Sequence, residues 1–288
     1  MQFNCTKISE MGKEALYRAK FIHDTLDKDG ETIVQNNQHG EKALRVDIEA
    51  EKAVIDVLKK YKFPVKIISE EHGLIELGEK QEYLALIDGL DGSIEYKRNR
   101  GIGRYGTMLG IFSTTAPCYN DYIFCGIMEH SSNTVYFTTK GNGSYRIDNS
   151  LKKIHCSNYK VLNKADTRLY IDEEYDKAKK STFIYDTFLS KFYDYHRLIQ
   201  PSSAVHYIDL ANGQADAVLE CTRKGNLEIG ISYGLVKEAG GVIKGINGEE
   251  IGSEKYFSYH QHDIYPIISA ASHELADCII EYIKNWRE

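Results

Sequence analysis

The sequence of 288 residues lacks several features that would assign it to a class at once. No window approaches the roughly 18 apolar residues of a membrane span, and Met1 to Leu16 contains neither a basic leader nor a signal-peptide core. No basic run stands out from the net charge of -6, which argues against nucleic acid as the main partner. We therefore expect a cytoplasmic protein with no membrane partner and no nucleic-acid partner.

The cysteines and histidines also lack the patterns of a transition-metal site. No two of the six cysteines form a C-x-x-C pair, so zinc ligation is disfavoured and reduced thiols are the simpler interpretation. The histidines show no H-E-x-x-H spacing, and His260-Gln261-His262-Asp263 is more typical of a solvated loop than of a metal site. The sequence contains no internal repeat.

What the sequence does contain is the composition of a globular protein, 42% hydrophobic and 27% charged, long enough for one large domain or two halves with a shared core. Helical periodicity predicts amphipathic helices at about 9–28 and 47–61. Apolar runs between turn signals predict strands at about 65–68, 83–87, 105–114, 121–130, 134–140 and 145–147. The polar residues 29–45 predict a mobile loop or a short hairpin.

The second half of the chain begins with a charged and weakly patterned stretch at residues 148–182. We therefore place a boundary there and predict two parts, residues 1–150 and residues 151–288. In the second part, the same criteria predict helices at about 183–196, 202–213, 227–239 and 272–286. They predict strands at about 197–200, 215–220, 242–244 and 265–270.

The most informative stretch is Tyr83 to Ser93, where five apolar residues end in Asp88-Gly89-Leu90-Asp91-Gly92-Ser93. The apolar run predicts a buried strand, so both carboxylates should leave the sheet at one point, on a loop. Carboxylates this close repel each other unless a cation lies between them or one of them takes a proton. Oxygen ligands of this kind suit Mg²⁺, Mn²⁺ or Ca²⁺. The stretch therefore predicts a metal site at the end of a strand, although an Asp/Gly turn is the plain structural alternative.

Two further acidic features lie close to this stretch in the sequence. Glu70 and Glu71 follow the strand at 65–68, so two neighbouring strands would deliver acidic groups to one edge of a sheet. Asp47 lies near the start of its predicted helix, where a carboxylate also stabilises the free amide end. A solvated turn for the Glu pair and a simple helix-start charge for Asp47 stay open as alternatives.

Three segments together resemble the signatures of the inositol monophosphatase superfamily: Ile68-Ser69-Glu70-Glu71, Asp88 to Ser93, and Glu228 followed by Glu238-Ala239-Gly240-Gly241. These Mg²⁺-dependent, lithium-sensitive sugar phosphatases include fructose-1,6-bisphosphatases and phosphoadenosine phosphatases. The resemblance extends from Met11 to about Ala270. It implies an α+β fold, a layered α-β-α-β-α sandwich with the active site between two halves, and commonly a homodimer.

The resemblance also implies roles for individual residues. The implied ligands of two or three Mg²⁺ ions are Glu70, Asp88, the Leu90 carbonyl, Asp91 and Glu228. Asp88 would bridge two of these ions. Glu228 also has the alternative role of a helix-start charge.

The implied catalytic residues are Glu70, Asp47 and Ser93, with Asp47 holding the Ser93 hydroxyl in a proton relay. Backbone amides at Gly92 and Ser93 would bind phosphate, as the start of a helix can. Ser203, in Ser202-Ser203-Ala204, and Glu220 would contact the substrate, although Glu220 could equally be a strand-end charge. Two metals about 4 Å apart would activate a water and stabilise the leaving oxygen.

Several positions depart from the family pattern. Gly89 stands where proline is usual, Ile94-Glu95 where Thr-Asn is usual, and Leu227-Glu228 where Trp-Asp is usual. The sequence therefore predicts a Mg²⁺-dependent phosphatase of a small sugar or polyol phosphate monoester, with inositol 1-phosphate as the first candidate. Fructose-1,6-bisphosphatase activity, phosphoadenosine phosphatase activity, and a catalytically weak regulatory relative that binds metal and ligand are the alternatives.

Overall fold

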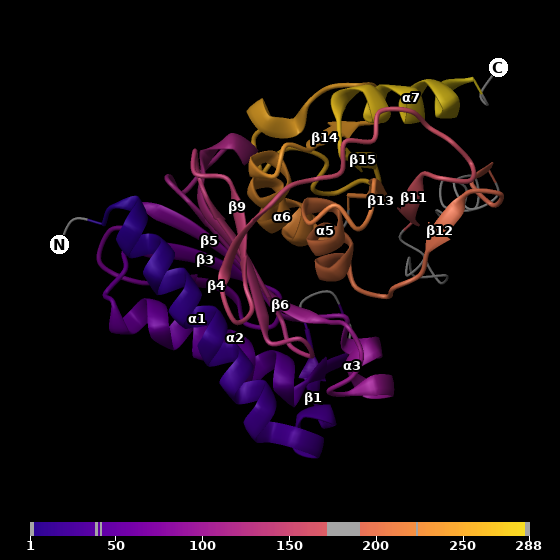
Figure 1. The fold of residues 1–288 in the computed structure, drawn as a ribbon. Helices are drawn as coiled ribbons and strands as arrows, with labels where there is room; N and C mark the ends of the chain where they lie inside the picture. Colours follow the sequence, from indigo (N-terminus) through magenta and orange to yellow (C-terminus); the bar gives the residue numbers. More distant parts are fainter. Residues whose placement is uncertain (1–2, 38–39, 41, 172–190, 223, 286–288) are drawn as a thin grey trace.

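The computed structural model describes residues 3–37, 40, 42–171, 191–222 and 224–285. Helices and sheets alternate through the molecule (Figure 1), beginning with α1 (Cys5–Leu26) and α2 (Arg45–Lys60) on one face of an eight-stranded sheet. α5 (Ser203–Ala211) and α6 (Leu227–Glu238) lie between that sheet and a five-stranded sheet, which α7 (His273–Lys284) covers on its far side. The predicted α-β-α-β-α sandwich is confirmed.

The eight-stranded sheet is antiparallel except for the parallel pair β3–β5. In spatial order its strands are β10 (Leu151–Ile154), β9 (Ser144–Ile147), β8 (Thr134–Thr139), β7 (Tyr122–Glu129), β6 (Gly106–Phe112), β5 (Tyr83–Asp91), β3 (Val65–Ser69) and β4 (Gly73–Glu76). A separate hairpin joins β1 (Ile33–Asn36) to β2 (Lys42–Leu44), which confirms the short hairpin predicted for residues 29–45. The short helix α3 (Ser93–Asn99) follows β5.

The five-stranded sheet is mixed, because β11 runs parallel to both of its neighbours while β15 runs antiparallel to both of its own. Its spatial order is β12 (His196–Leu198), β11 (Arg168–Ile171), β13 (Ala217–Cys221), β15 (Pro266–Ala270) and β14 (Val242–Gly245). Short 3-10 turns occur at Asp27–Glu31, Tyr119–Asp121, Lys224–Asn226 and Ile251–Ser253.

Residues 148–182, where the sequence predicts a boundary between two halves, contain two strands that the sequence analysis did not predict, β10 and β11. β10 is an edge strand whose first three residues are exposed, and lysines on an exposed edge give no apolar alternation to detect. The eight-stranded sheet therefore extends to Ile154, and the division at residue 150 stays a prediction. The helix predicted at 183–196 falls largely outside the described residues.

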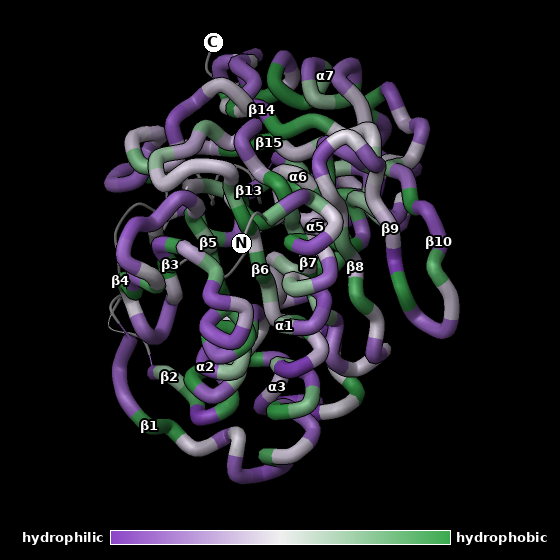
Figure 2. The backbone as a smooth tube through the Cα atoms, turned by 90° about the vertical axis from the view of Figure 1, so that its left-hand side faces the viewer, coloured by the Kyte–Doolittle hydropathy of each residue, from purple (hydrophilic) through white to green (hydrophobic). Residues whose placement is uncertain are grey.

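Burial explains why the inner and outer helices have different sequences. Every residue of α5 is buried, and so is every residue of α6 from Leu227 to Val236, as expected for a layer covered on two sides. α1 and α2 alternate hydrophilic and hydrophobic residues (Figure 2), since only one face of each packs on the sheet.

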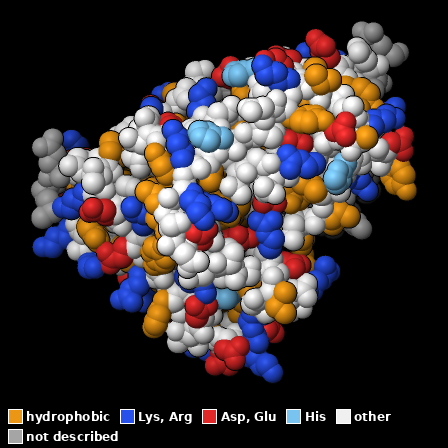
Figure 3. Space-filling model, in the orientation of Figure 1, with side chains coloured by type: hydrophobic (Ala, Val, Ile, Leu, Met, Phe, Trp, Pro, Cys, Tyr) orange, Lys and Arg blue, Asp and Glu red, His pale blue; other side chains and the backbone are white. Residues whose placement is uncertain are grey.

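Among the helices of the described residues, none combines the length and the apolar character that a membrane span needs. Acidic and basic side chains are interspersed over the face drawn in Figure 3.

The third signature segment ends in a structural contact. The Glu238 carboxylate, at the end of α6, accepts hydrogen bonds from the Gly141 amide at 2.6 Å, the Gly143 amide at 2.7 Å and the Tyr122 hydroxyl at 2.8 Å. These donors belong to the β8–β9 turn and to β7. One side chain therefore anchors the middle helix layer to the eight-stranded sheet.

We expect Glu238→Ala to lower the free energy of unfolding by about 1–3 kcal/mol, because it leaves the partly buried Gly143 amide and Tyr122 hydroxyl without an acceptor. Urea denaturation of the metal-free protein measures this loss. Glu281→Ala, on the exposed side of α7, is the matched control and should change stability little. Equal stability of the two variants would contradict an anchoring role for Glu238.

Candidate active site

Three acidic side chains converge where β5 ends and α6 begins. Asp88, Asp91 and Glu228 each offer a carboxylate oxygen, and these oxygens lie within 4.8 Å of one another. Asp88 and Glu228 are buried, whereas Asp91 is partly exposed. Contrary to the expected loop, β5 continues through Asp91, with a bulge between the two aspartates. The structure thus brings together three of the five predicted metal ligands as one group.

Glu70 reaches the same edge of the sheet from the neighbouring strand. The parallel pairing of β3 with β5 ends at Ser69 and Ile87, so Glu70 and Asp88 follow at the same point. The Glu70 amide donates to the Ile87 carbonyl at 3.2 Å. The Leu90 amide donates to Asp88 Oδ1 at 3.0 Å. Ligation by the Glu70 carboxylate and by the Leu90 carbonyl stays a prediction.

The negative charges of the carboxylates at this edge repel one another, and this repulsion adds to the effect of burial on the pKa of Asp88. Burial raises the pKa of Asp88 well above its usual range, and the charges of Glu70, Asp91, Glu228 and Asp47 raise it further. A divalent cation at this point would offset the repulsion, and carboxylate oxygens are the donors that Mg²⁺ prefers. The residues present therefore fit the metal that the resemblance implies.

Asp47 is the third residue of α2 and belongs to the same charge cluster. Burial raises its pKa well above the usual range, with further contributions from Glu70, Glu71 and Glu51. Its carboxylate accepts from the Leu44 amide at 3.4 Å. Among the described residues, no hydrogen bond joins Asp47 to Ser93. The proton relay between these two side chains stays a prediction.

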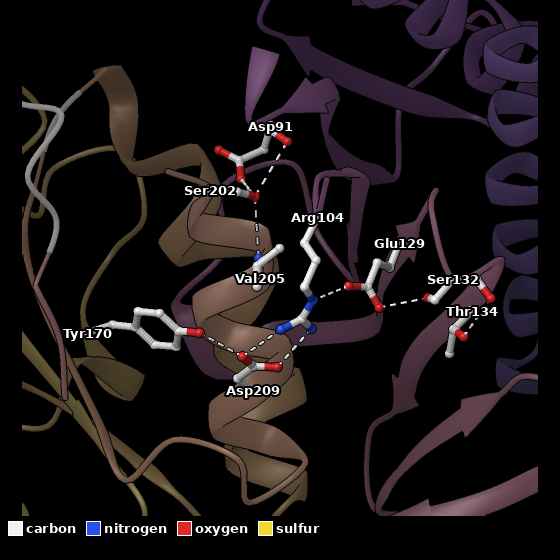
Figure 4. A network of polar contacts seen from close by, with 9 residues as sticks. All are labelled: Asp91, Arg104, Glu129, Ser132, Thr134, Tyr170, Ser202, Val205 and Asp209. Carbon is white, nitrogen blue, oxygen red and sulfur yellow. Dashed lines mark hydrogen bonds and ion pairs between the residues drawn. The ribbon is translucent and has the colours of Figure 1, made fainter. Parts of the chain in front are cut away.

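The start of α5 binds Asp91 from the other side of the site (Figure 4). Asp91 Oδ2 accepts from the Ser202 hydroxyl at 2.5 Å and from the Ala204 amide at 2.7 Å. Ser202 is also the N-cap of α5, since its oxygen accepts from the Val205 amide at 3.4 Å. Ser203, the predicted substrate contact, is the first residue of this helix and is buried.

Gly92 links the acidic cluster to α3. It lies in the left-handed region, with φ of 92°, and is the N-cap of α3, which begins at Ser93. A Cβ at this position would lie 2.9 Å from the Ser202 Cβ and 3.0 Å from the Tyr105 Cβ. Both the conformation and the close approach therefore require glycine. Phosphate binding by the amides of Gly92 and Ser93 stays a prediction.

Glu220 lies in β13, opposite Ile267 of β15, and is 2% exposed. Its charge is close enough to contribute to the raised pKa of Tyr119, which burial raises most. The structure thus places a carboxylate inside the C-terminal half, and the predicted contact with substrate stays a prediction.

The sequence analysis missed Glu51, which is fully buried one helical turn after Asp47. Its carboxylate accepts from the Ser69 hydroxyl, from the Glu71 amide at 3.1 Å and from His72 Nδ1 at 2.8 Å. This hydrogen bond raises the pKa of His72. Glu51 thus fixes the turn that carries Glu70, and its spacing of four residues from Asp47 on one helix face was the available signal.

A second missed group ties α5 to the N-terminal part of the chain (Figure 4). The Arg104 guanidinium donates two hydrogen bonds of 2.8 Å to Asp209 of α5 and a third to Glu129 at the end of β7. The Tyr170 hydroxyl donates to the same Asp209 carboxylate at 2.7 Å. Arg104 therefore holds the helix whose first turn binds Asp91.

The crowded carboxylates predict an unusual pH dependence for the metal-free protein. Because the pKa of Asp88 is raised on folding, the folded chain retains a proton that the unfolded chain releases above about pH 4. Stability in EDTA should therefore fall as the pH rises. Asp88→Asn removes this charge, so we expect it to stabilise the metal-free protein by about 0.5–2 kcal/mol at pH 8 and by less at pH 5.

Urea denaturation in EDTA at the two pH values measures this difference. Asp56→Asn, at an exposed position of α2, is the control and should show no gain at pH 8. If the parent protein is as stable as Asp88→Asn at pH 8, the charge of Asp88 does not destabilise the metal-free protein, and the prediction is wrong.

Comparisons with known proteins agree with this arrangement. A model of the inositol monophosphatase family matches residues 4–287. The chain is 26% identical over 237 residues to a fructose-1,6-bisphosphatase/inositol-1-monophosphatase of Methanothermobacter thermautotrophicus, covering 78% of each chain. It is 25% identical over 260 residues to the enzyme of the same name from Methanocaldococcus jannaschii, covering 89% of this chain and 90% of that one.

A bifunctional NADP phosphatase/NAD kinase of Methanocaldococcus jannaschii is 24% identical over 251 residues, which cover 76% of this chain and 41% of that one.

Solved structures of other proteins share the fold of this chain. An inositol monophosphatase–fructose 1,6-bisphosphatase superposes with a TM-score of 0.71 at 23% identity, covering 95% of this chain and 98% of that one. A Thermotoga maritima IMPase gives 0.73 at 18% identity, covering 96% of each chain. The chain belongs to the inositol monophosphatase family, whose members are phosphatases that hydrolyse phosphate monoesters.

Proposed function

We propose that this chain is a Mg²⁺-dependent phosphatase that hydrolyses a small sugar or polyol phosphate monoester, with inositol 1-phosphate as its first candidate substrate. The observation that carries the proposal is that carboxylate oxygens of Asp88, Asp91 and Glu228 lie within 4.8 Å of one another. The reaction adds one water to the ester and yields an alcohol and inorganic phosphate. A homodimer and a cytoplasmic location belong to the same proposal; the homodimer rests on the family resemblance, and the location is the expectation from the sequence.

Two or three Mg²⁺ ions would be held by Glu70, Asp88, the Leu90 carbonyl, Asp91 and Glu228. Bound Mg²⁺ supplies the chemistry that the ester needs, since it acidifies a water and stabilises the leaving oxygen.

The chain's own groups would orient the ester and take the proton of the attacking water. The amides of Gly92 and Ser93 would hold the phosphoryl oxygens. The Ser93 hydroxyl would pass the proton to the Asp47 carboxylate, and burial next to other carboxylates raises the pKa of Asp47 and so makes this carboxylate a stronger proton acceptor. Ser203 and Glu220 would hold the organic part of the substrate.

The relatives support a panel of substrates, since their names include fructose-1,6-bisphosphatase, inositol-1-monophosphatase and NADP phosphatase activities. The panel is inositol 1-phosphate, fructose 1,6-bisphosphate, phosphoadenosine phosphate and NADP, each with Mg²⁺ and with EDTA. We expect Mg²⁺-dependent phosphate release, highest with inositol 1-phosphate. A higher rate with another ester would replace the substrate and leave the reaction class intact.

We expect Asp88→Asn to lower kcat by about 100-fold or more, because it weakens the electrostatic stabilisation on which the reaction depends. Asp56→Asn is the matched control and should retain parental activity. Asp88→Asn activity within a few-fold of the parent would overturn the metal assignment. If the parent protein binds Mg²⁺ but hydrolyses none of the four substrates, the catalytically weak regulatory relative is favoured instead.

Glu220 offers a separate test of the substrate site. If its carboxylate accepts a hydrogen bond from a substrate hydroxyl, Glu220→Gln should raise KM about tenfold and change kcat less, since a hydrogen bond to a charged group contributes about 1.5–3 kcal/mol. Steady-state kinetics on the best substrate measures both constants. Glu249→Gln is the control, because Glu249 accepts from Tyr265 and Tyr259 within the same half. An unchanged KM would remove Glu220 from the substrate site.

A further inference from the structure

The spacing of Asp88 and Asp91 is created by a β-bulge. β5 pairs with β6 at Asp88 and Met108 and again at Asp91 and Gly106. Two residues of β5, Gly89 and Leu90, therefore lie opposite one residue of β6, Thr107. An extra residue of this kind bends its strand and redirects the neighbouring side chains. The bulge lets Asp88 and Asp91 contribute to one cluster although they are three residues apart.

The Thr107 side chain bonds directly to the bulge. Thr107 is fully buried, and its hydroxyl donates to the Gly89 carbonyl at 2.6 Å. His130 Nε2 lies 3.0 Å from the same hydroxyl oxygen. Because the carbonyl can only accept and the hydroxyl has one hydrogen, Nε2 must be the donor to Thr107. This assigns the Nε2–H tautomer to His130, and Nδ1 has no hydrogen-bond partner in the described part of the chain.

His130 itself is held rigidly. It follows β7, its amide donates to the Tyr105 carbonyl at 3.1 Å, and its ring stacks on His23 with centroids 4.4 Å apart. His130 is 2% exposed. A fixed donor therefore orients the Thr107 hydroxyl, and that hydroxyl in turn holds the Gly89 carbonyl.

α2 confines Gly89 from another direction. A Cβ at Gly89 would lie 2.3 Å from the Asp47 carbonyl oxygen and 2.8 Å from the Glu51 Cγ, so the strand and the helix are in direct contact here. The residue after Gly89 is also fixed, since the Leu90 amide donates to Asp88 Oδ1. Backbone position at the bulge and carboxylate position at Asp88 are thus coupled.

We propose that Thr107, oriented by His130, is a positioning residue for the metal site, because its hydroxyl fixes the bulge that sets Asp88 and Asp91 toward one cation. Neither Thr107 nor His130 is one of the predicted ligands. The proposal rests on the proposed function in so far as the acidic cluster binds Mg²⁺. Hydrogen-bonding partners that orient the ligands of a metal typically change its affinity by about 10–100-fold when they are lost.

Thr107→Val tests this proposal, since it removes the hydroxyl and keeps the branched shape. Thr107→Ser keeps the hydroxyl and should rescue binding. Thr138→Val is the matched control, because Thr138 is equally buried in β8 and its hydroxyl donates to the Gly143 carbonyl at 2.9 Å, outside the acidic cluster. Metal-free protein is titrated with Mn²⁺, with free Mn²⁺ measured by electron paramagnetic resonance, and Mg²⁺ is then added as competitor.

We expect the dissociation constants of Thr107→Val for Mn²⁺ and Mg²⁺ to rise about tenfold, with Thr107→Ser and Thr138→Val close to the parent. In the phosphatase assay, Thr107→Val should need more Mg²⁺ for half-maximal rate, and saturating Mg²⁺ should recover most of kcat. His130→Phe keeps the ring stack but not the donor, and should weaken binding in the same direction. Adding it to Thr107→Val should cause no further loss, since His130 acts through Thr107.

The outcomes distinguish a failure of the positioning role of Thr107 from a failure of the proposed function. If the parent binds metal and Thr107→Val binds it equally well, the positioning role is overturned and the proposed function stands. Equal losses in Thr107→Val and Thr138→Val would also overturn it, because the loss would then follow from general destabilisation of the sheet. A parent that binds neither metal ion would overturn the proposed function and this inference with it.

Discussion

The repulsion among buried carboxylates at the end of β5 is the constraint on which the rest of the active site depends. Asp88 and Glu228 are buried, Asp91 lies beside them, and the charges of Asp47 and Glu70 act on the same point. Such a cluster costs folding free energy, and the surrounding structure must over-determine its geometry. The elements that carry the cluster are stabilised by large buried faces, since β5 is an interior strand of its sheet and nearly all of α6 is buried.

The groups that orient these carboxylates are mainly neutral donors. Asp91 accepts from a hydroxyl and an amide at the start of α5, Asp88 from the Leu90 amide, and Asp47 from the Leu44 amide. Donors of this kind fix direction without neutralising charge. The Arg104 guanidinium is directed instead to Glu129 and Asp209. The arrangement thus keeps the carboxylates preorganised and leaves their charge to be balanced by a metal ion.

The sequence predicted those parts of the fold whose signal is local. Long amphipathic helices and apolar strands have their own periodicity, and the predicted metal ligands lie in three short segments. β10 was missed because an exposed edge strand shows no alternation. Thr107 was missed because every residue of β6 is buried, so a threonine there is typical of any strand. Arg104 and Asp209 are 105 residues apart, and only the folded chain brings them together.

The structure accommodates two of the departures from the family pattern, Gly89 and Glu228. Proline at position 89 would place ring atoms where the Asp47 carbonyl now lies, so the glycine permits a closer approach of α2 to β5. Glu228 is one methylene longer than the usual aspartate, yet its carboxylate still lies within 4.8 Å of those of Asp88 and Asp91. A chain that no longer bound a metal would be relieved of this strain by a single neutralising substitution. The retained geometry therefore favours a working metal site, which the proposed phosphatase reaction requires.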